Sequence, residues 1–202
     1  MPFAAFAGLN GGMLRNTETG YGLVAIVFHW TIAALFAGQV ALGLYMTGLA
    51  DDAPAKFGLY QWHKSFGLVI LLLALVRLAW RLTNPVPDLP EAVPAFEQRA
   101  ARLAHVFLYA AIVLVPVTGW AFVSSSPLGI PTFAFYLVVV PHLPVPVSEA
   151  AEAALQRVHT GLALISATAA ILHTGAALRH HFGLKDAVLR RMVVPARRRR
   201  GE

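Results

Sequence analysis

Long apolar stretches alternate with short charged segments along most of the chain. Four of them, at about residues 22–46, 61–80, 101–122 and 155–178, are long enough to be membrane-spanning helices. A helix needs about 20 residues to cross a hydrocarbon core about 30 Å thick. The fourth stretch is the clearest, because residues 158–178 carry no charge and are bounded by Arg157 and Arg179. The pattern predicts an all-α membrane protein, a bundle of four transmembrane helices.

A further apolar stretch, residues 132–140, is too short to cross a membrane. It also lies among prolines, at positions 127, 131, 141, 144 and 146, which interrupt helices. We therefore expect this segment to be an interfacial loop rather than a fifth span.

The composition agrees with a membrane protein. Hydrophobic residues make up 57% of the chain and charged residues only 13%, which excludes a soluble globular domain and a disordered chain. The chain has no cysteine, so it holds no disulfide, iron–sulfur cluster or thiolate zinc site. Its eight histidines are therefore the obvious source of metal ligands.

Lysine and arginine are distributed unevenly over the two sides of the expected bundle. Of the 16 such residues, Lys56, Lys64 and Arg157 fall on one side, and the other 13 fall on the side of the two termini. The positive-inside rule then places both termini in the cytoplasm. We expect residues 1–202 to form a single transmembrane domain with a basic cytoplasmic tail, residues 179–202. Attraction of this tail to anionic membrane lipid explains its charge, and we expect no nucleic-acid partner.

Histidines within the expected helices are informative, because ionisable groups inside a membrane are costly and usually functional. His159 and His173 are 14 residues apart in the fourth stretch. That spacing is about 21 Å along a helix and within about 40° of the same face. By depth, His63 matches His159 near the outer surface, and His29 matches His173 near the cytoplasmic surface. The sequence therefore predicts two histidine pairs at two depths.

Two neutral imidazoles from facing helices are what a haem needs for its two axial positions in a helical bundle. Gly67, Gly161 and Gly175 lie near these histidines, which weakly supports a flat macrocycle, since small residues are also common in helix packing. A zinc or di-metal site usually adds Asp, Glu or Cys ligands, and the four stretches contain none. Hydrogen bonding or proton relay is the other role of a membrane histidine. We favour haem ligation.

His105 is left over at the depth of His29 and His173. It could replace one of them as a ligand, hydrogen-bond a propionate or a quinone carbonyl, or pack; we favour a supporting or packing role. Basic residues near each pair are candidate partners for anionic haem propionates: Lys64 and Arg157 on the outer side, Arg77 and Arg81 on the inner side. Ordinary flanking charge equally explains Arg77 and Arg81. His180 and His181 read as an interfacial basic cluster, and His142 carries no decisive signal.

Several motifs, in their order and spacing, resemble the bacterial cytochrome b561 family over about residues 17–195. They are FHW around His29, QWHKSFG around His63 with LVRLAWR after it, LAHVFLY around His105, VHTGLA around His159 and ILHTGAALRHHF around His173. The resemblance implies a four-helix protein of the bacterial inner membrane with two b-type haems that exchanges electrons with the quinone pool. By motif position, His29 and His173 would ligate the cytoplasmic haem, and His63 and His159 the outer haem.

The resemblance leaves the function open between classes. One branch of the family is similar to an oxidoreductase that takes electrons from superoxide outside and delivers them to ubiquinone. Other branches resemble cytochrome b subunits that serve a hydrogenase or dehydrogenase through a partner protein, for which residues 127–147 could be a docking surface or equally a lid over the outer haem. A third reading is a haem-free, histidine-lined proton or ion transporter.

Overall fold

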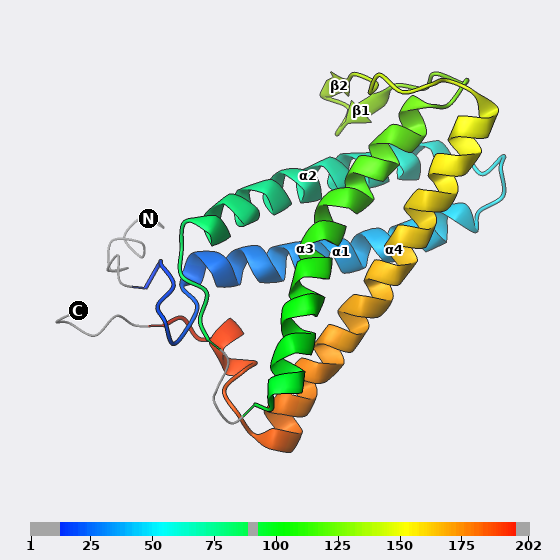
Figure 1. The fold of residues 1–202 in the computed structure, drawn as a ribbon. Coiled ribbons are helices and arrows are strands. Elements are labelled where there is room, and N and C mark those ends of the chain that lie inside the picture. The colour runs from blue at the N-terminus through cyan, green and yellow to red at the C-terminus, as the bar shows by residue number, and fades with distance from the viewer. Residues whose placement is uncertain (1–12, 89–92, 197–202) are drawn as a thin grey trace. The chain divides into compact units, whose positions relative to one another are not determined.

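Four long helices dominate the computed structural model, which describes residues 13–88 and 93–196 (Figure 1). They are α1 (Leu23–Thr47), α2 (Lys56–Leu82), α3 (Ala95–Ser124) and α4 (Glu149–Leu178), which continues as a π-helical segment, Arg179–Leu184. All four are long and apolar enough to cross a membrane. The predicted four-span helical architecture is confirmed. The arginines at positions 197–200 of the basic tail lie outside the described residues.

Three of the helices begin about five residues earlier than their apolar stretches predict. α2 begins at Lys56, α3 at Ala95 and α4 at Glu149. Apolar residues mark only the part of a helix inside the hydrocarbon, whereas backbone hydrogen bonding continues into the charged residues at its end. The start of α4 is capped by Ser148, whose Oγ accepts a hydrogen bond from the N–H of Ala151 (3.1 Å).

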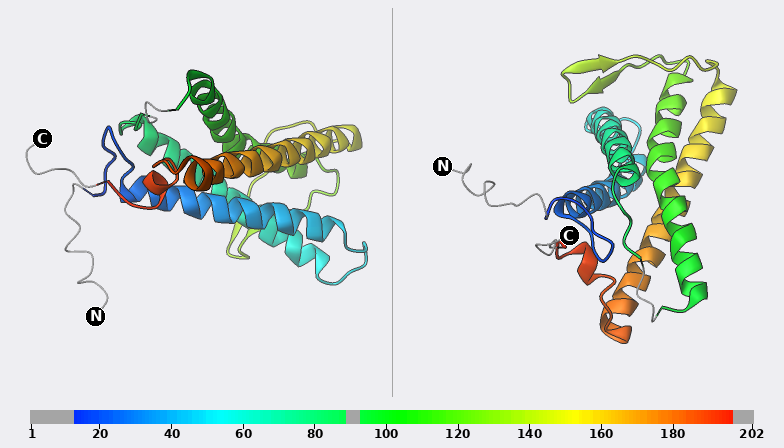
Figure 2. Two further views of the ribbon diagram at one scale, coloured as in Figure 1. Left: turned by 90° about the horizontal axis from the view of Figure 1, so that it is seen from below. Right: turned by 60° about the vertical axis from the view of Figure 1, so that its left-hand side comes forward.

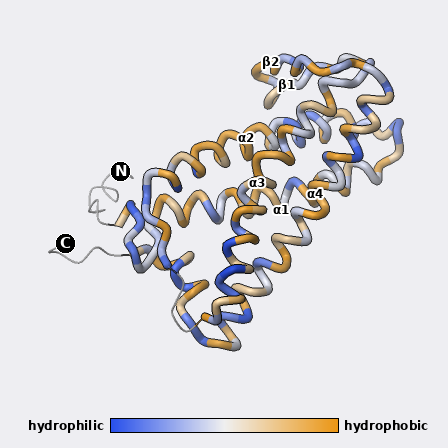
Figure 3. The backbone as a smooth tube through the Cα atoms, viewed as in Figure 1, coloured by the Kyte–Doolittle hydropathy of each residue, from blue (hydrophilic) through white to orange (hydrophobic). Residues whose placement is uncertain are grey.

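Many apolar side chains of the helices are exposed. The exposed fractions of Leu72, Ile171 and Leu172 are 63%, 71% and 69%. Figure 3 shows apolar colour along most of α1 and α2 and hydrophilic colour in the first turns of α3. In a chain with four apolar spans, such exposed side chains are those that face lipid.

The described chain forms two compact units, and each long helix contributes a segment to both. The first unit consists of Met1–Thr31, Val76–His105 and Ile171–Glu202, and the second of Ile32–Leu75 and Val106–Ala170. His29, Arg77, Arg81, His105 and His173 therefore belong to the first unit. His63, Lys64, Arg157 and His159 belong to the second. Each predicted histidine pair lies inside one unit.

Residues 132–140 do not form a fifth helix but a β-hairpin in the connection between α3 and α4. Strands β1 (Thr132–Ala134) and β2 (Val138–Val140) pair antiparallel, with Phe133 opposite Val139. The turn is closed by the Leu137 N–H, which donates to the Ala134 carbonyl (2.9 Å). Its two central residues, Phe135 and Tyr136, have positive φ angles of 50° and 58°, which residues other than glycine rarely adopt.

Polar side chains of α2 hold the hairpin, which lies alongside this helix in Figures 1 and 2. The Gln61 amide accepts from the Phe133 N–H (3.0 Å) and donates to the Pro131 carbonyl (3.1 Å). The Ser65 hydroxyl accepts from the Phe135 N–H (2.9 Å). Aromatic packing adds to this contact, since the Phe135 ring lies 5.3 Å from Phe66 and 5.6 Å from Trp62. These contacts offset the strained turn.

Candidate functional site

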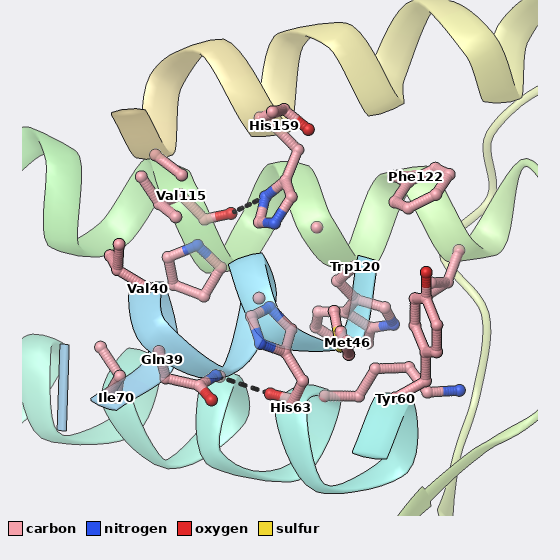
Figure 4. A pocket seen from close by; sticks show the side chains of 18 of the residues that line it. Gln39, Val40, Met46, Tyr60, His63, Ile70, Val115, Trp120, Phe122 and His159 are labelled. Atoms are coloured by element: carbon pink, nitrogen blue, oxygen red, sulfur yellow. Dashed lines mark hydrogen bonds between the residues drawn. The ribbon is translucent and has the colours of Figure 1, made fainter. Parts of the chain in front are cut away.

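An apolar pocket in the second unit lies between His63 of α2 and His159 of α4. The two imidazoles point toward one another across the pocket (Figure 4), with ring centroids 6.3 Å apart and planes at 86°. Side chains of α1 and α3, among them Val40 and Trp120, complete the wall. The pair that sequence depth predicted is therefore brought together inside one cavity.

A hydrogen bond fixes the proton position on His159. Its Nδ1 lies 3.0 Å from the backbone carbonyl oxygen of Val115 in α3 (Figure 4). Because a carbonyl oxygen only accepts, Nδ1 must carry the proton, and Nε2 of a neutral ring keeps its lone pair. That is the arrangement in which histidines bind metals, with the other ring nitrogen donating to a carbonyl or carboxylate.

Two glycines on other helices lie close to the two rings, and their lack of a side chain leaves room for the imidazoles. A Cβ carbon at Gly119 of α3 would lie 2.9 Å from Cε1 of His159, and one at Gly43 of α1 would lie 3.3 Å from Cε1 of His63. Neither glycine is close to a histidine along the sequence, unlike Gly67, Gly161 and Gly175, which were predicted to be near the rings. Of these three, Gly67 lines the pocket, whereas a Cβ at Gly161 or Gly175 would meet nothing within 4 Å.

His63 is held differently from His159. Its Nδ1 is buried and has no hydrogen-bond partner among the described residues, so packing rather than hydrogen bonding orients the ring. The Gln39 side chain donates to the backbone carbonyl of His63 (2.7 Å), which ties α1 to α2 at this level (Figure 4).

The other predicted histidine pair lies in the first unit. His29 of α1 and His173 of α4 have ring centroids 6.3 Å apart, the same separation as in the other pair, with planes at 70°. His105 of α3 lies closer to His173 than His29 does, with ring centroids 5.4 Å apart. The structure thus brings all three histidines together, with unequal spacings.

Arg77 lies against His29. Its Nη2 is 3.2 Å from His29 Nδ1, and because a guanidinium has only donors, this Nδ1 is the acceptor. Arg77 acts electrostatically on His173 and on His105 as well, and Arg81 on His105. Arg77 and Arg81 are therefore close to the histidines of the first unit.

The predicted outer basic residues are placed differently from one another. Lys64 lines the pocket and donates through Nζ to the Pro131 carbonyl (3.2 Å). Arg157 is exposed and does not line the pocket. The structure therefore brings Lys64, but not Arg157, to the wall of the site.

His180 differs from the interfacial basic cluster that its neighbours suggest. Its ring lies between two carboxylates, with Nδ1 bonded to Asp186 and Nε2 3.5 Å from Glu97. His181 is exposed and packs edge-on against Phe182, and His142 lies 3.4 Å from the Ile130 carbonyl. This site was not predictable, because Glu97 is far from His180 along the chain.

The spacing of the two pairs suits a metal held axially by two imidazoles. Metal–nitrogen bonds of about 2 Å and imidazole radii of about 1.1 Å place the centroids of two opposed rings about 6.2 Å apart. Both pairs match this spacing at 6.3 Å, and the 5.4 Å between His105 and His173 is too short for it. Among the described residues no group of three or more His, Cys, Asp or Glu is arranged to hold a metal ion. Each of the two pairs has a spacing that fits one metal ion bound by two imidazole nitrogens.

Comparisons with known proteins identify the family. The model of the prokaryotic cytochrome b561 family matches residues 20–195. Cytochrome b561 homolog 2 of Escherichia coli is 28% identical over 180 residues, which cover 88% of this chain and 93% of that protein. The probable superoxide oxidase CybB of Yersinia pestis is 29% identical over 86% of this chain and 95% of its own length. Cytochrome b562 of Cereibacter sphaeroides is 30% identical over 88% of this chain and 98% of its own length. The chain therefore belongs to the prokaryotic cytochrome b561 family, haem b proteins that transfer electrons in the bacterial inner membrane.

Proposed function

We propose that this protein is a di-haem cytochrome that moves electrons between an outer-side donor, such as superoxide, and ubiquinone. The observation that carries the proposal is the presence of two separate histidine pairs with the same centroid spacing of 6.3 Å. His63 and His159 would hold one haem, and His29 and His173 would hold the other. Each bound haem supplies an iron that takes up and gives back one electron.

The protein's own residues prepare these sites. The Val115 carbonyl keeps the proton of His159 on Nδ1, so that Nε2 is available to iron. Gly43 and Gly119 leave room for the two outer imidazoles to keep their present orientation. His105, with its ring 5.4 Å from His173, supports that ligand by packing against it rather than by binding iron itself.

Basic residues close to each pair would neutralise the haem propionates. Arg77 and Arg81 serve the pair in the first unit, and Lys64 serves the pair in the second, since it lines the pocket. Arg157 is the weakest candidate because it is exposed outside the pocket lining.

The overall reaction would oxidise two superoxide ions to two dioxygen molecules and reduce one ubiquinone, with two protons, to ubiquinol. The relative named as a probable superoxide oxidase supports this choice of donor. We place both termini, and hence the His29–His173 pair, on the cytoplasmic side, because 13 of the 16 Lys and Arg residues fall there. We further propose that residues 1–202 act as a single domain around the two sites, in contact with membrane lipid and without nucleic acid.

Haem content tests the proposal directly. Purified wild-type protein in mild detergent should carry two b-type haems per chain, measured as the pyridine haemochrome. His159→Ala and His173→Ala should each retain one haem, and His105→Ala should retain both. A single haem in the wild-type protein, or two haems in either of the first two variants, would contradict the pairing. Complete absence of haem from folded protein would favour the histidine-lined transporter.

A second candidate function is an electron-transfer subunit that serves a hydrogenase or dehydrogenase. The observation in its favour is the apolar surface of the hairpin, where Leu137, Val138 and Val139 are 85%, 62% and 58% exposed. Quinone reduction by the purified protein with superoxide as the donor supports the oxidoreductase. Absence of that activity, together with a partner that stays bound after gentle solubilisation, supports the subunit.

A further inference from the structure

The two histidine pairs differ in the direction of one hydrogen bond. In the second unit, His159 Nδ1 donates to the Val115 carbonyl. In the first unit, His29 Nδ1 accepts from the Arg77 guanidinium, 3.2 Å away. A ring that donates from Nδ1 gains electron density and becomes a more basic ligand, which stabilises oxidised iron. Next to the His29 ring there is instead a cation, Arg77, and a nearby positive charge destabilises oxidised iron.

The charged side chains near the two pairs also favour a higher reduction potential in the first unit. Arg77 acts electrostatically on His173 and His105 in addition to its contact with His29, so its charge lies within the histidine cluster. A positive charge in a membrane interior favours the less positive, reduced state of a neighbouring metal. In the second unit, the hydrogen bond that Lys64 makes within the described residues goes to the Pro131 carbonyl rather than to a histidine.

The charge of Arg77 stays at this site whichever way the ring adjusts to a metal. Because Arg77 donates to Nδ1, the proton of a neutral His29 ring is on Nε2. For Nε2 to bind iron, that proton must move to Nδ1, which ends the hydrogen bond from Arg77 but leaves the guanidinium beside the ring. There its charge would offset the negative charge of a haem propionate, which also raises the potential.

We infer that Arg77 gives a haem held by His29 and His173 a higher reduction potential than one held by His63 and His159. This inference rests on the proposed function and adds to it the direction of electron flow between the two haems. An electron would then pass downhill from a haem held by His63 and His159, which is oxidised, to a haem held by His29 and His173, which is reduced, with no atom or proton transferred. Arg77 is thus a positioning residue that sets the direction of electron flow toward the cytoplasmic side.

Optical redox titration of variants that keep one haem tests the order of the potentials. His159→Ala retains the haem of the first unit and His173→Ala that of the second. We expect the midpoint potential of the His159→Ala protein to be the higher of the two. Equal or reversed potentials would overturn the inference. The count of haems per chain separates this outcome from failure of the proposed function, because a wild-type protein with fewer than two haems fails the earlier test instead.

Substitution of Arg77 in the His159→Ala protein tests the cause. At a fixed ambient potential, Arg77→Gln should lower the ratio of reduced to oxidised haem by about tenfold, and Arg77→Lys should restore most of it. Arg179→Gln is the matched control, since Arg179 pairs with Glu97 and its side chain is 58% exposed, and it should leave the ratio unchanged. An unchanged ratio in Arg77→Gln would overturn the role of Arg77. If that variant loses its haem, Arg77→Met, which also removes the charge but keeps a long side chain, replaces it: the same fall in the ratio supports the role of Arg77, and an unchanged ratio overturns it.

Discussion

Gly119 of α3 faces the imidazole of His159 of α4 so closely that a Cβ carbon at this position would lie 2.9 Å from Cε1 and 3.1 Å from Nδ1. Real Cβ atoms essentially never approach another heavy atom to less than 3.0 Å. The ring has little freedom to retreat, because its Nδ1 is bonded to the carbonyl of Val115 on the same helix as Gly119.

Gly119→Ala should therefore displace His159 and release the haem that we assign to it. We expect the haem content to fall from about two per chain to about one, measured as the pyridine haemochrome of the purified variant. Gly161→Ala is the control, since a Cβ there meets nothing within 4 Å and Gly161 does not line the pocket. Full haem content in Gly119→Ala would show that His159 is not tied to an axial position.

The hairpin should depend on Gln61, whose side chain is 1% exposed and bonds to the backbone at Phe133 and Pro131. Gln61→Ala leaves the Phe133 N–H without this partner, which costs about 1–3 kcal/mol, whereas the Pro131 carbonyl keeps its hydrogen bond from Lys64. We expect faster amide hydrogen exchange at Phe133 and lower thermal stability. Gln156→Ala, which removes an exposed glutamine from the same unit, should leave the hairpin exchange unchanged. Equal protection of Phe133 in both variants would contradict this role.

The helices and the two histidine pairs were accessible from the sequence because both depend on local spacing. Apolar length defines a span, and 14 residues on one helix place His159 and His173 on nearly the same face. The contacts of the two glycines with the imidazole rings could not be predicted from the sequence. Gly43 and Gly119 lie on helices other than those of the rings they contact, so their role depends on how α1 and α3 are rotated about their axes.

The hairpin could not be predicted from the sequence for a different reason. Turns with positive φ at both central residues usually contain Asn or Gly there, and this one contains Phe135 and Tyr136. Contacts with Trp62 and Phe66 of α2 make that turn tolerable, and those contacts exist only in the folded protein. Tertiary packing therefore overrides the local preference.

The orientation in the membrane is testable because the chain has no cysteine. Asp52→Cys places one thiol in the loop between α1 and α2, and Ala187→Cys places one after α4. Both positions are exposed. From the distribution of Lys and Arg, we expect a membrane-impermeant maleimide to label Asp52→Cys in spheroplasts, and Ala187→Cys only after permeabilisation. The reverse pattern would place the termini outside and exchange the sides of the two histidine pairs.

The segment after α4 should be held by the carboxylate of Asp186. Partial burial acts to raise the pKa of Asp186, but hydrogen bonds from the Val188 N–H and from His180, together with the charge of Arg191, outweigh it and lower this pKa below its ordinary value of 3.8. A carboxyl group whose pKa is lower in the folded protein stabilises the fold at every pH above its ordinary pKa. That stabilisation is lost as the pH falls through the lowered pKa.

Asp186→Asn should accordingly lower the thermal unfolding midpoint at neutral pH by about 2 °C, and the difference from the wild-type protein should shrink as the pH falls below 4. Unfolding followed by tryptophan fluorescence in detergent, at pH values from 7 down to 3, measures both midpoints. Asp52→Asn removes an exposed carboxylate and is the matched control. A difference between Asp186→Asn and wild type that stays constant with pH would show that Asp186 acts through its shape rather than its charge, because only loss of an ionised partner is cancelled by protonation.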